Sequence, residues 1–145
     1  MATRTQRPWH LWIIAPLALI WMAFGTADYL LVTLRRPEYL DLFSPDQVAF
    51  FTSLSIQVKA LWAGYVWAGI AGALALLMRE AWAPVALALA FFCGLGQTVW
   101  LVLINEPGLL SIAGTLGAQI LIVSLAVSLL LWLYARSLRT RGALG

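Results

Sequence analysis

The run WHLWIIAPLALIWMAFGTADYLLVTL, residues 9–34, is apolar almost throughout and holds a single carboxylate, Asp28. A helix that crosses the hydrocarbon core of a membrane needs ~20 apolar residues, so this run is long enough to span. A carboxylate in such a helix is costly on the side that faces lipid, and intramembrane acids usually face the interior of a bundle. We therefore expect Asp28 to point toward other helices of the same protein.

The remainder of the chain has the same character. Of its 145 residues, 63% are hydrophobic and 10% are charged, and the mean hydropathy is +0.90. In a soluble domain roughly a quarter of residues are charged. Further apolar runs lie at about 54–78, 82–104 and 109–134. The sequence therefore predicts an all-α, polytopic membrane four-helix bundle that occupies residues 1–145 as one domain.

A secretory signal peptide is the alternative for the first run, because Arg4 and Arg7 precede it as a charged region precedes a signal's apolar core. The apolar stretch is longer than such a core, and no clean cleavage site of small residues follows it. We expect the run to remain as the first membrane helix.

Residues 35–53 form the one sizeable loop. Pro37 ends the first helix, because the residue before a proline is pushed away from helical geometry. Within the loop, Ser44-Pro45-Asp46-Gln47 has the composition of a capping box, with proline at the first helical position. A short surface helix is predicted at 45–52, before a membrane helix that starts near Ser53. One side of this loop is apolar and either rests in the membrane interface or packs over the helix ends: Tyr39, Leu42, Phe43, Val48, Phe50 and Phe51.

The arginines favour one orientation, because the side of a membrane protein richer in Arg and Lys is usually cytoplasmic. Six arginines fall on the side of the two termini, whereas Arg35 and Arg36, with Lys59 at most, fall on the other. We expect both termini in the cytoplasm (N-in, C-in) and the 35–53 loop on the opposite side of the membrane. The six are Arg4, Arg7, Arg79, Arg136, Arg139 and Arg141.

Polar side chains recur at similar depths. At a rise of 1.5 Å per residue, Asp28 and Lys59 each lie ~9 Å from the outer ends of their helices, Gln97 lies ~10 Å and Gln119 ~15 Å. We predict that Asp28 and Lys59 approach each other, since buried charges usually pair. Trp21 and Trp67 are expected to flank this layer. The layer either fixes which helices face each other or holds a ligand or ion, and the sequence leaves both open.

Small residues recur at helical spacing on the last three runs and predict close helix packing, since there is little hydrophobic drive between helices in lipid. Gly25 shares a helical face with Asp28. The predicted packing positions are Gly25, Ala60, Gly64, Ala68, Gly72, Ala90, Gly94, Gly114 and Ala118.

Several functions are disfavoured. Cys93 is the single cysteine, which excludes an intramolecular disulfide and a thiol relay that needs a pair. His10 is the single histidine, which excludes haem held by two histidines of one chain, and it is expected to be an interfacial polar side chain. The positive charge lies at the ends of membrane segments, which indicates no nucleic-acid partner. No catalytic or metal-binding motif is present, so we expect neither an enzyme nor a cofactor.

The motifs of the first half carry a resemblance. Trp21-x-x-x-Gly25-x-x-Asp28-Tyr29 is followed by Thr33, Arg36-Pro37-x-Tyr39-Leu40, Phe43-Ser44-Pro45, Ala60-Leu61-Trp62-Ala63 and Val66-Trp67. Over about residues 8–104 the chain resembles a family of small, four-helix proteobacterial inner-membrane proteins that often carry the label "sugar transporter". The resemblance implies a four-helix membrane fold and raises the possibility of transport.

Two functional hypotheses follow. The first is a structural or accessory subunit that packs with itself or with a larger membrane complex. The second is a small-molecule transporter, working as a homo-oligomer with Asp28 and Lys59 in the pathway. Both have the lipid bilayer as their surroundings.

Overall fold

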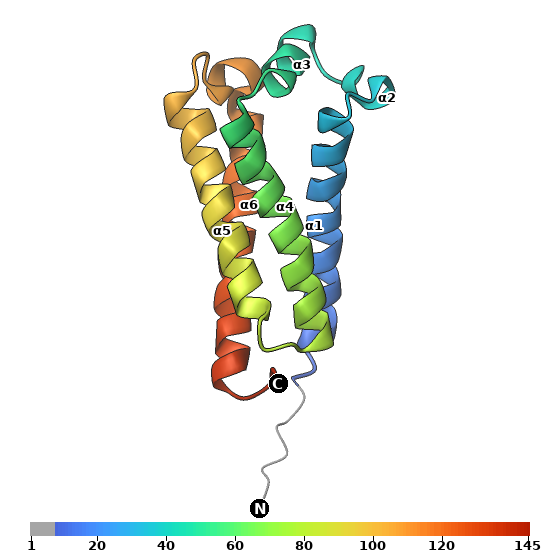
Figure 1. Cartoon of the computed structure of the whole chain (residues 1–145), viewed down its shortest axis with the longest axis vertical. Helices are drawn as coiled ribbons and strands as arrows, with labels where there is room; N and C mark the ends of the chain where they lie inside the picture. The colour runs from blue at the N-terminus through green and yellow to red at the C-terminus, as the bar shows by residue number, and fades with distance from the viewer. Residues whose placement is uncertain (1–7) are drawn as a thin grey trace, which may run out of the picture.

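The computed structural model describes residues 8–145, and all the regular secondary structure in that part of the chain is helical. Its long helices are α1 (Leu11–Thr33), α4 (Ile56–Met78), α5 (Ala83–Val99) and α6 (Leu109–Thr140), as Figure 1 shows. A π-helical turn, η1 (Trp100–Ile104), extends α5, and two short helices, α2 (Pro37–Leu40) and α3 (Pro45–Thr52), lie between α1 and α4. The predicted all-α four-helix bundle with a surface helix between its first two long helices is confirmed.

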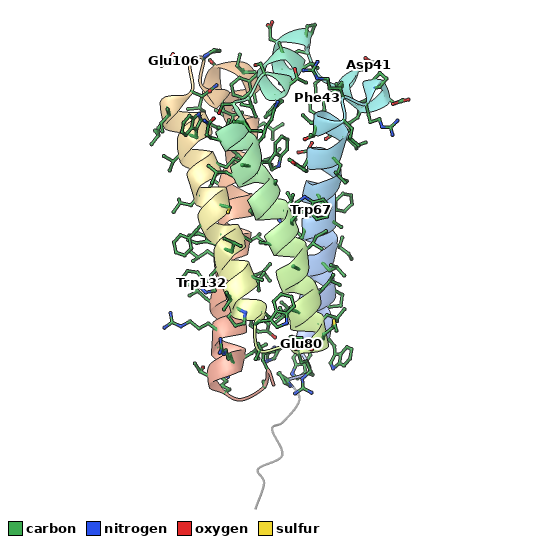
Figure 2. All side chains as sticks on the ribbon, viewed as in Figure 1. Asp41, Phe43, Trp67, Glu80, Glu106 and Trp132 are labelled. Atoms are coloured by element: carbon green, nitrogen blue, oxygen red, sulfur yellow. The ribbon has the colours of Figure 1, made fainter. Side chains whose placement is uncertain are left out.

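Four segments are long and apolar enough to cross a membrane, among them α5 together with η1 as one span, Ala83–Ile104. Large apolar side chains project outward from the long helices into the space that lipid would fill (Figure 2). Charged side chains lie at the ends, with Asp41 and Glu106 at one end and Glu80 at the other. The protein is a multi-pass membrane protein whose outer faces contact the bilayer.

The boundary between α3 and α4 follows from two caps. The Ser44 hydroxyl accepts a hydrogen bond from the Gln47 amide nitrogen at 3.3 Å, and the Gln47 side-chain oxygen accepts from the Ser44 nitrogen at 3.2 Å, which completes the predicted capping box. Ser55 caps α4 in turn, through its hydroxyl and the Val58 nitrogen. The membrane helix therefore begins at Ile56, later than the expected start at about residue 54.

The end of the bundle that holds the C-terminus is closed. Small residues of α1, α4 and α6 belong to one buried cluster at this end: Ala15, Ala18, Ala73 and Ala135. His10, at the start of α1, hydrogen-bonds the Tyr134 hydroxyl of α6 at 2.5 Å. The Arg79 guanidinium donates to the Ala143 carbonyl oxygen at 3.0 Å. Residues 1–7, with Arg4 and Arg7, lie outside the described part.

Helices α4 and α5 pack closely through glycines at two levels, with Gly64 and Gly94 at one level and Gly72 at the other. A Cβ atom added at Gly64, Gly72 or Gly94 would come within 3 Å of a side chain on the other helix. Ala90 is fully buried as well, whereas Gly25, Ala68 and Ala118 are half-buried.

Two of the predicted packing residues lie elsewhere. Ala60 is exposed. Gly114 is exposed and adopts φ 63° and ψ −165° within α6, with no atom within 4 Å of an added Cβ. Gly114 is therefore the site of a kink rather than of a helix contact, because this backbone conformation is readily accessible only to glycine.

Replacing Gly72 by Ala is expected to destabilise the bundle by about 1–3 kcal/mol, the usual range for overpacking. The added methyl would lie 2.7 Å from Leu87 Cγ and 3.1 Å from the Leu87 backbone nitrogen, which cannot move freely. Thermal unfolding in mild detergent, followed by circular dichroism, measures the change. Gly25→Ala is the matched control, because its nearest neighbour would be Val66 Cγ1 at 3.9 Å. Equal stability of the two variants would contradict the close α4–α5 packing.

Candidate functional site

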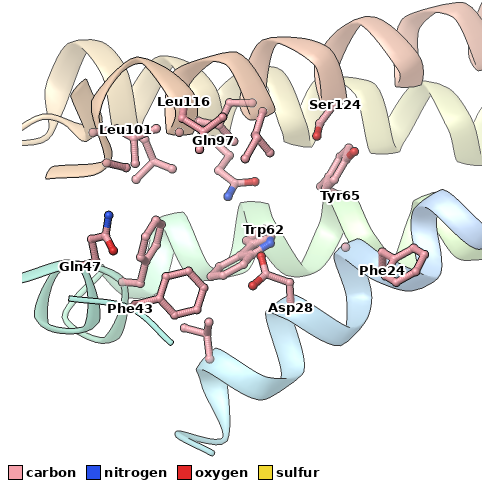
Figure 3. Close-up of a pocket in the computed structure, with 18 of the residues that line it drawn as sticks. Phe24, Asp28, Phe43, Gln47, Trp62, Tyr65, Gln97, Leu101, Leu116 and Ser124 are labelled. Atoms are coloured by element: carbon pink, nitrogen blue, oxygen red, sulfur yellow. The ribbon is translucent and has the colours of Figure 1, made fainter. Parts of the chain in front are cut away.

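A cavity of about 460 Å³ lies between α1 and α6, near the end of the bundle opposite the C-terminus. Helix α4 and the end of α5 form its back wall, and α2 and α3 lie over it (Figure 3). Its lining is mostly apolar. The polar and aromatic groups that face it include Asp28, Tyr39, Gln47, Gln97, Ser124, Trp21, Trp62 and Tyr65.

The cavity exists because α1 and α6 do not pack along their whole length. α1 packs on α4, α4 on α5 and α5 on α6, so α1 and α6 are the two open edges of the arrangement. They meet at the closed end through His10 and Tyr134. Toward the other end, Phe24 of α1 and Leu116 of α6 line the cavity and are still 74% and 66% exposed. The cavity therefore opens sideways, toward the position of the bilayer.

Asp28 is held at the cavity wall by a residue of the loop. The Tyr39 hydroxyl donates a 2.5 Å hydrogen bond to Asp28 Oδ1. Pro37 at the first position of α2 starts that helix directly after α1, which turns Tyr39 back over Asp28. Burial, and then the hydrogen bond to Asp28, raise the pKa of the Tyr39 phenol well above its usual value. Tyr39 therefore stays protonated and acts as the donor.

The expected approach of Lys59 to Asp28 is not found. The Lys59 ammonium donates to the Thr52 carbonyl oxygen at 3.0 Å instead. Since α4 starts at Ile56, Lys59 lies in its first turn, beside the end of α3. The last carbonyl groups of a helix have no partner within it and attract cations. Thr52 therefore provides a nearer partner than Asp28 does.

Gln97 lies within the bundle and faces the cavity. Its residue is 6% exposed, yet its side chain makes no hydrogen bond to the described residues. Thr26 and Thr98, by contrast, bond to carbonyl groups of their own helices. Within residues 8–145, every side-chain nitrogen or oxygen that is fully enclosed has a hydrogen-bond partner. Because the Gln97 amide has none, it is not fully enclosed and is open to the cavity. Figure 3 shows this amide pointing into the space that Asp28 also borders.

The predicted polar layer is thus brought together only in part. Asp28 and Gln97 border the same cavity, with Trp21 beside them. Gln119 is exposed on the outer face of α6, and Trp67 is 49% exposed and is not part of the cavity wall. The depth of each residue along its helix was estimated from the sequence, but its direction around the helix was not.

Sequence reasoning missed several residues of the site. Tyr39, Phe43 and Phe51 of the loop, and Trp62 of α4, face the cavity. The apolar side of the loop was the available signal, with packing over the helix ends as one of its two interpretations. The structure supports that interpretation, since Phe50 is buried and the Gln47 amide donates to the Ile112 carbonyl oxygen of α6 at 3.4 Å.

The side chains at the cavity suit hydrogen bonding and charge pairing. Among residues 8–145, no three His, Cys, Asp or Glu side chains are grouped so that they could hold a metal ion. The polar groups at the cavity are one carboxylate, hydroxyls and amides, which suit hydrogen bonding and charge pairing. No protein-family model, curated protein or solved structure matches this chain significantly.

Proposed function

We propose that this membrane protein binds a small amphiphilic molecule in the cavity between α1 and α6. The Gln97 amide carries the proposal, because its residue is 6% exposed, its amide opens into the cavity and it has no hydrogen-bond partner in the described protein. A few polar groups that face an otherwise apolar cavity are what fixes a ligand's orientation in small-molecule sites. A bound molecule can therefore hydrogen-bond Gln97 without displacing a partner within the described protein.

The size and composition of the cavity support the same function. Small-molecule sites usually measure ~300–1,000 Å³ and combine apolar walls with a few polar groups that orient the ligand. The cavity of about 460 Å³ falls in this range. Its side opening between Phe24 and Leu116 suits a molecule dissolved in the bilayer.

The transport hypothesis also requires that the protein bind a small molecule, so the two agree on that step. They differ in the residues that would contact the molecule. Asp28 remains a candidate ligand-binding residue, whereas Lys59, bonded to Thr52, does not. The resemblance to small four-helix proteins labelled sugar transporters is compatible with a binding cavity. The mostly apolar wall would leave many hydroxyl groups of a bound sugar without hydrogen-bond partners. The cavity therefore suits a ligand that is more apolar than a sugar. The chemistry of the site supports no catalytic role.

The accessory-subunit function is a second candidate, and it rests on the outer face of α6. Thr115 and Gln119 are both exposed and lie four residues apart on the part of α6 that follows the Gly114 kink. An amide that faces lipid is satisfied when it hydrogen-bonds across to another helix. A second copy of this protein, or another membrane subunit, would provide that helix.

We also propose that the protein lies in a bacterial inner membrane, as the resemblance implies, with both termini in the cytoplasm, as the arginine distribution favours. Cysteine labelling tests this orientation in a Cys93→Ser background. Glu106→Cys is expected to react with a membrane-impermeant maleimide in intact cells, whereas Glu80→Cys at the opposite end is expected to react only after lysis. The reverse pattern would invert the orientation.

The proposed function predicts that the purified protein carries a bound small molecule. Native mass spectrometry of protein extracted in mild detergent should detect it as a defined added mass. Gln97→Leu is expected to lower its occupancy about 5- to 10-fold, since one lost hydrogen bond is worth ~1 kcal/mol. Gln57→Leu, the same change at an exposed position of α4, should leave occupancy unaltered. No added mass on the wild type, or equal occupancy in both variants, would refute the function.

The same spectra test the second candidate. If α6 packs against another copy or subunit, the wild type is an oligomer or retains its partner, and Gln119→Leu shifts it toward the monomer. Leu116→Ala serves as the comparison on the same helix. A monomer for the wild type and both variants would leave no support for an assembly through Gln119.

A further inference from the structure

The charge of the cavity is unbalanced, and this points to the chemistry of its ligand. Asp28 is the one acidic residue that borders the cavity, and no Lys, Arg or His borders it within the described residues. Lys59, the expected partner of Asp28, is bonded to the Thr52 carbonyl group. An unpaired charge within a membrane costs at least ~2.5–3.5 kcal/mol, so such carboxylates normally have a cationic partner.

Tyr39 satisfies only part of the hydrogen-bonding capacity of the Asp28 carboxylate. It donates one hydrogen bond to Oδ1, whereas an ionised carboxylate has about four acceptor positions. Asp28 is half-buried and borders the cavity. The remaining acceptor positions are therefore available to a group inside the cavity.

Aromatic rings surround the same space. Phe43 and Trp62 border the cavity together with Asp28 and Tyr39 (Figure 3). Tyr39 and Phe43 meet edge to face with centroids 5.2 Å apart, which keeps the two rings at a fixed angle. The face of an aromatic ring attracts a cation within ~6 Å of its centre. The Asp28 carboxylate and the aromatic rings thus both favour a cationic ligand.

We propose that the cavity binds a hydrophobic organic cation that enters sideways from the bilayer between α1 and α6. The cationic group pairs with Asp28 beneath Tyr39, a polar atom of the ligand accepts from or donates to Gln97, and its hydrocarbon part lies along α6. This proposal rests on the proposed function and names the class of ligand for the same site.

Access from the side follows from what covers the cavity. The loop helices lie over the outer end, where the Gln47 amide is bonded to α6 at 3.4 Å. On the bilayer side, Ile120 of α6 lines the cavity and is 57% exposed, and Phe24 faces it from α1 with 74% exposure. A ligand that partitions into the membrane reaches this opening without moving the loop.

Two probes of matched size and opposite charge test the class of ligand. Tetraphenylphosphonium and tetraphenylborate are titrated separately onto the protein in nanodiscs of phosphatidylcholine, with uptake by empty nanodiscs subtracted. The wild type is expected to bind the phosphonium saturably and the borate not at all. Asp28→Asn should weaken phosphonium binding at least tenfold. Asp41→Asn, an exposed acid outside this cavity, should leave it unchanged.

Equal binding of the two probes, or binding of the borate alone, would overturn the proposal, and this comparison needs only the wild type. Unchanged phosphonium binding by a folded Asp28→Asn variant would overturn it as well. Suppose that the wild type carries a bound molecule, that Gln97→Leu removes this molecule, and that the wild type does not bind the phosphonium in preference to the borate. The proposed class of ligand is then wrong, and the proposed function stands. If the wild type carries no molecule and binds neither probe, both fail.

Discussion

A polar side chain surrounded by hydrocarbon needs a hydrogen-bond partner, and this constraint shapes the half of the molecule that carries the loop between α1 and α4. Asp28 accepts a hydrogen bond from Tyr39, Lys59 donates one to the Thr52 carbonyl group, and the Gln47 side chain donates one to the backbone of α6. Each of these bonds ties the loop between α1 and α4 to a membrane helix. The loop is thereby held over the bundle rather than beside it, and it encloses the cavity from that end.

The packing of the bundle explains why a cavity forms there. At the closed end, alanines and the His10–Tyr134 hydrogen bond bring α1 and α6 together. Along α4 and α5, glycines allow backbone contact. Neither arrangement continues between α1 and α6 toward the outer end, where Gly114 kinks α6. The space that remains is bordered by Asp28 and Gln97, whose polar atoms are not all satisfied by the protein.

Features that depend on local sequence could be predicted well. The length of the apolar runs predicted four membrane helices, and Ser44 and Gln47 predicted the start of α3, because each depends on neighbouring residues alone. The depth of Asp28 and Gln97 could also be estimated from the rise of a helix. The direction of a side chain could not, since it depends on how each helix is rotated in the bundle, and Gln119 is exposed and does not border the cavity for this reason. Lys59 was paired wrongly because the late start of α4 places it beside the end of α3.

The central claim is that the cavity between α1 and α6 is the binding site of a molecule that satisfies Gln97. An experimental structure of the protein, purified from its own membrane without exchange into a synthetic lipid, tests this most directly. The account predicts non-protein density between Phe24 and Ile120, within hydrogen-bonding distance of the Gln97 amide and near Asp28. A structure in which α1 and α6 close against each other, with the Gln97 amide bonded to the protein, would contradict it.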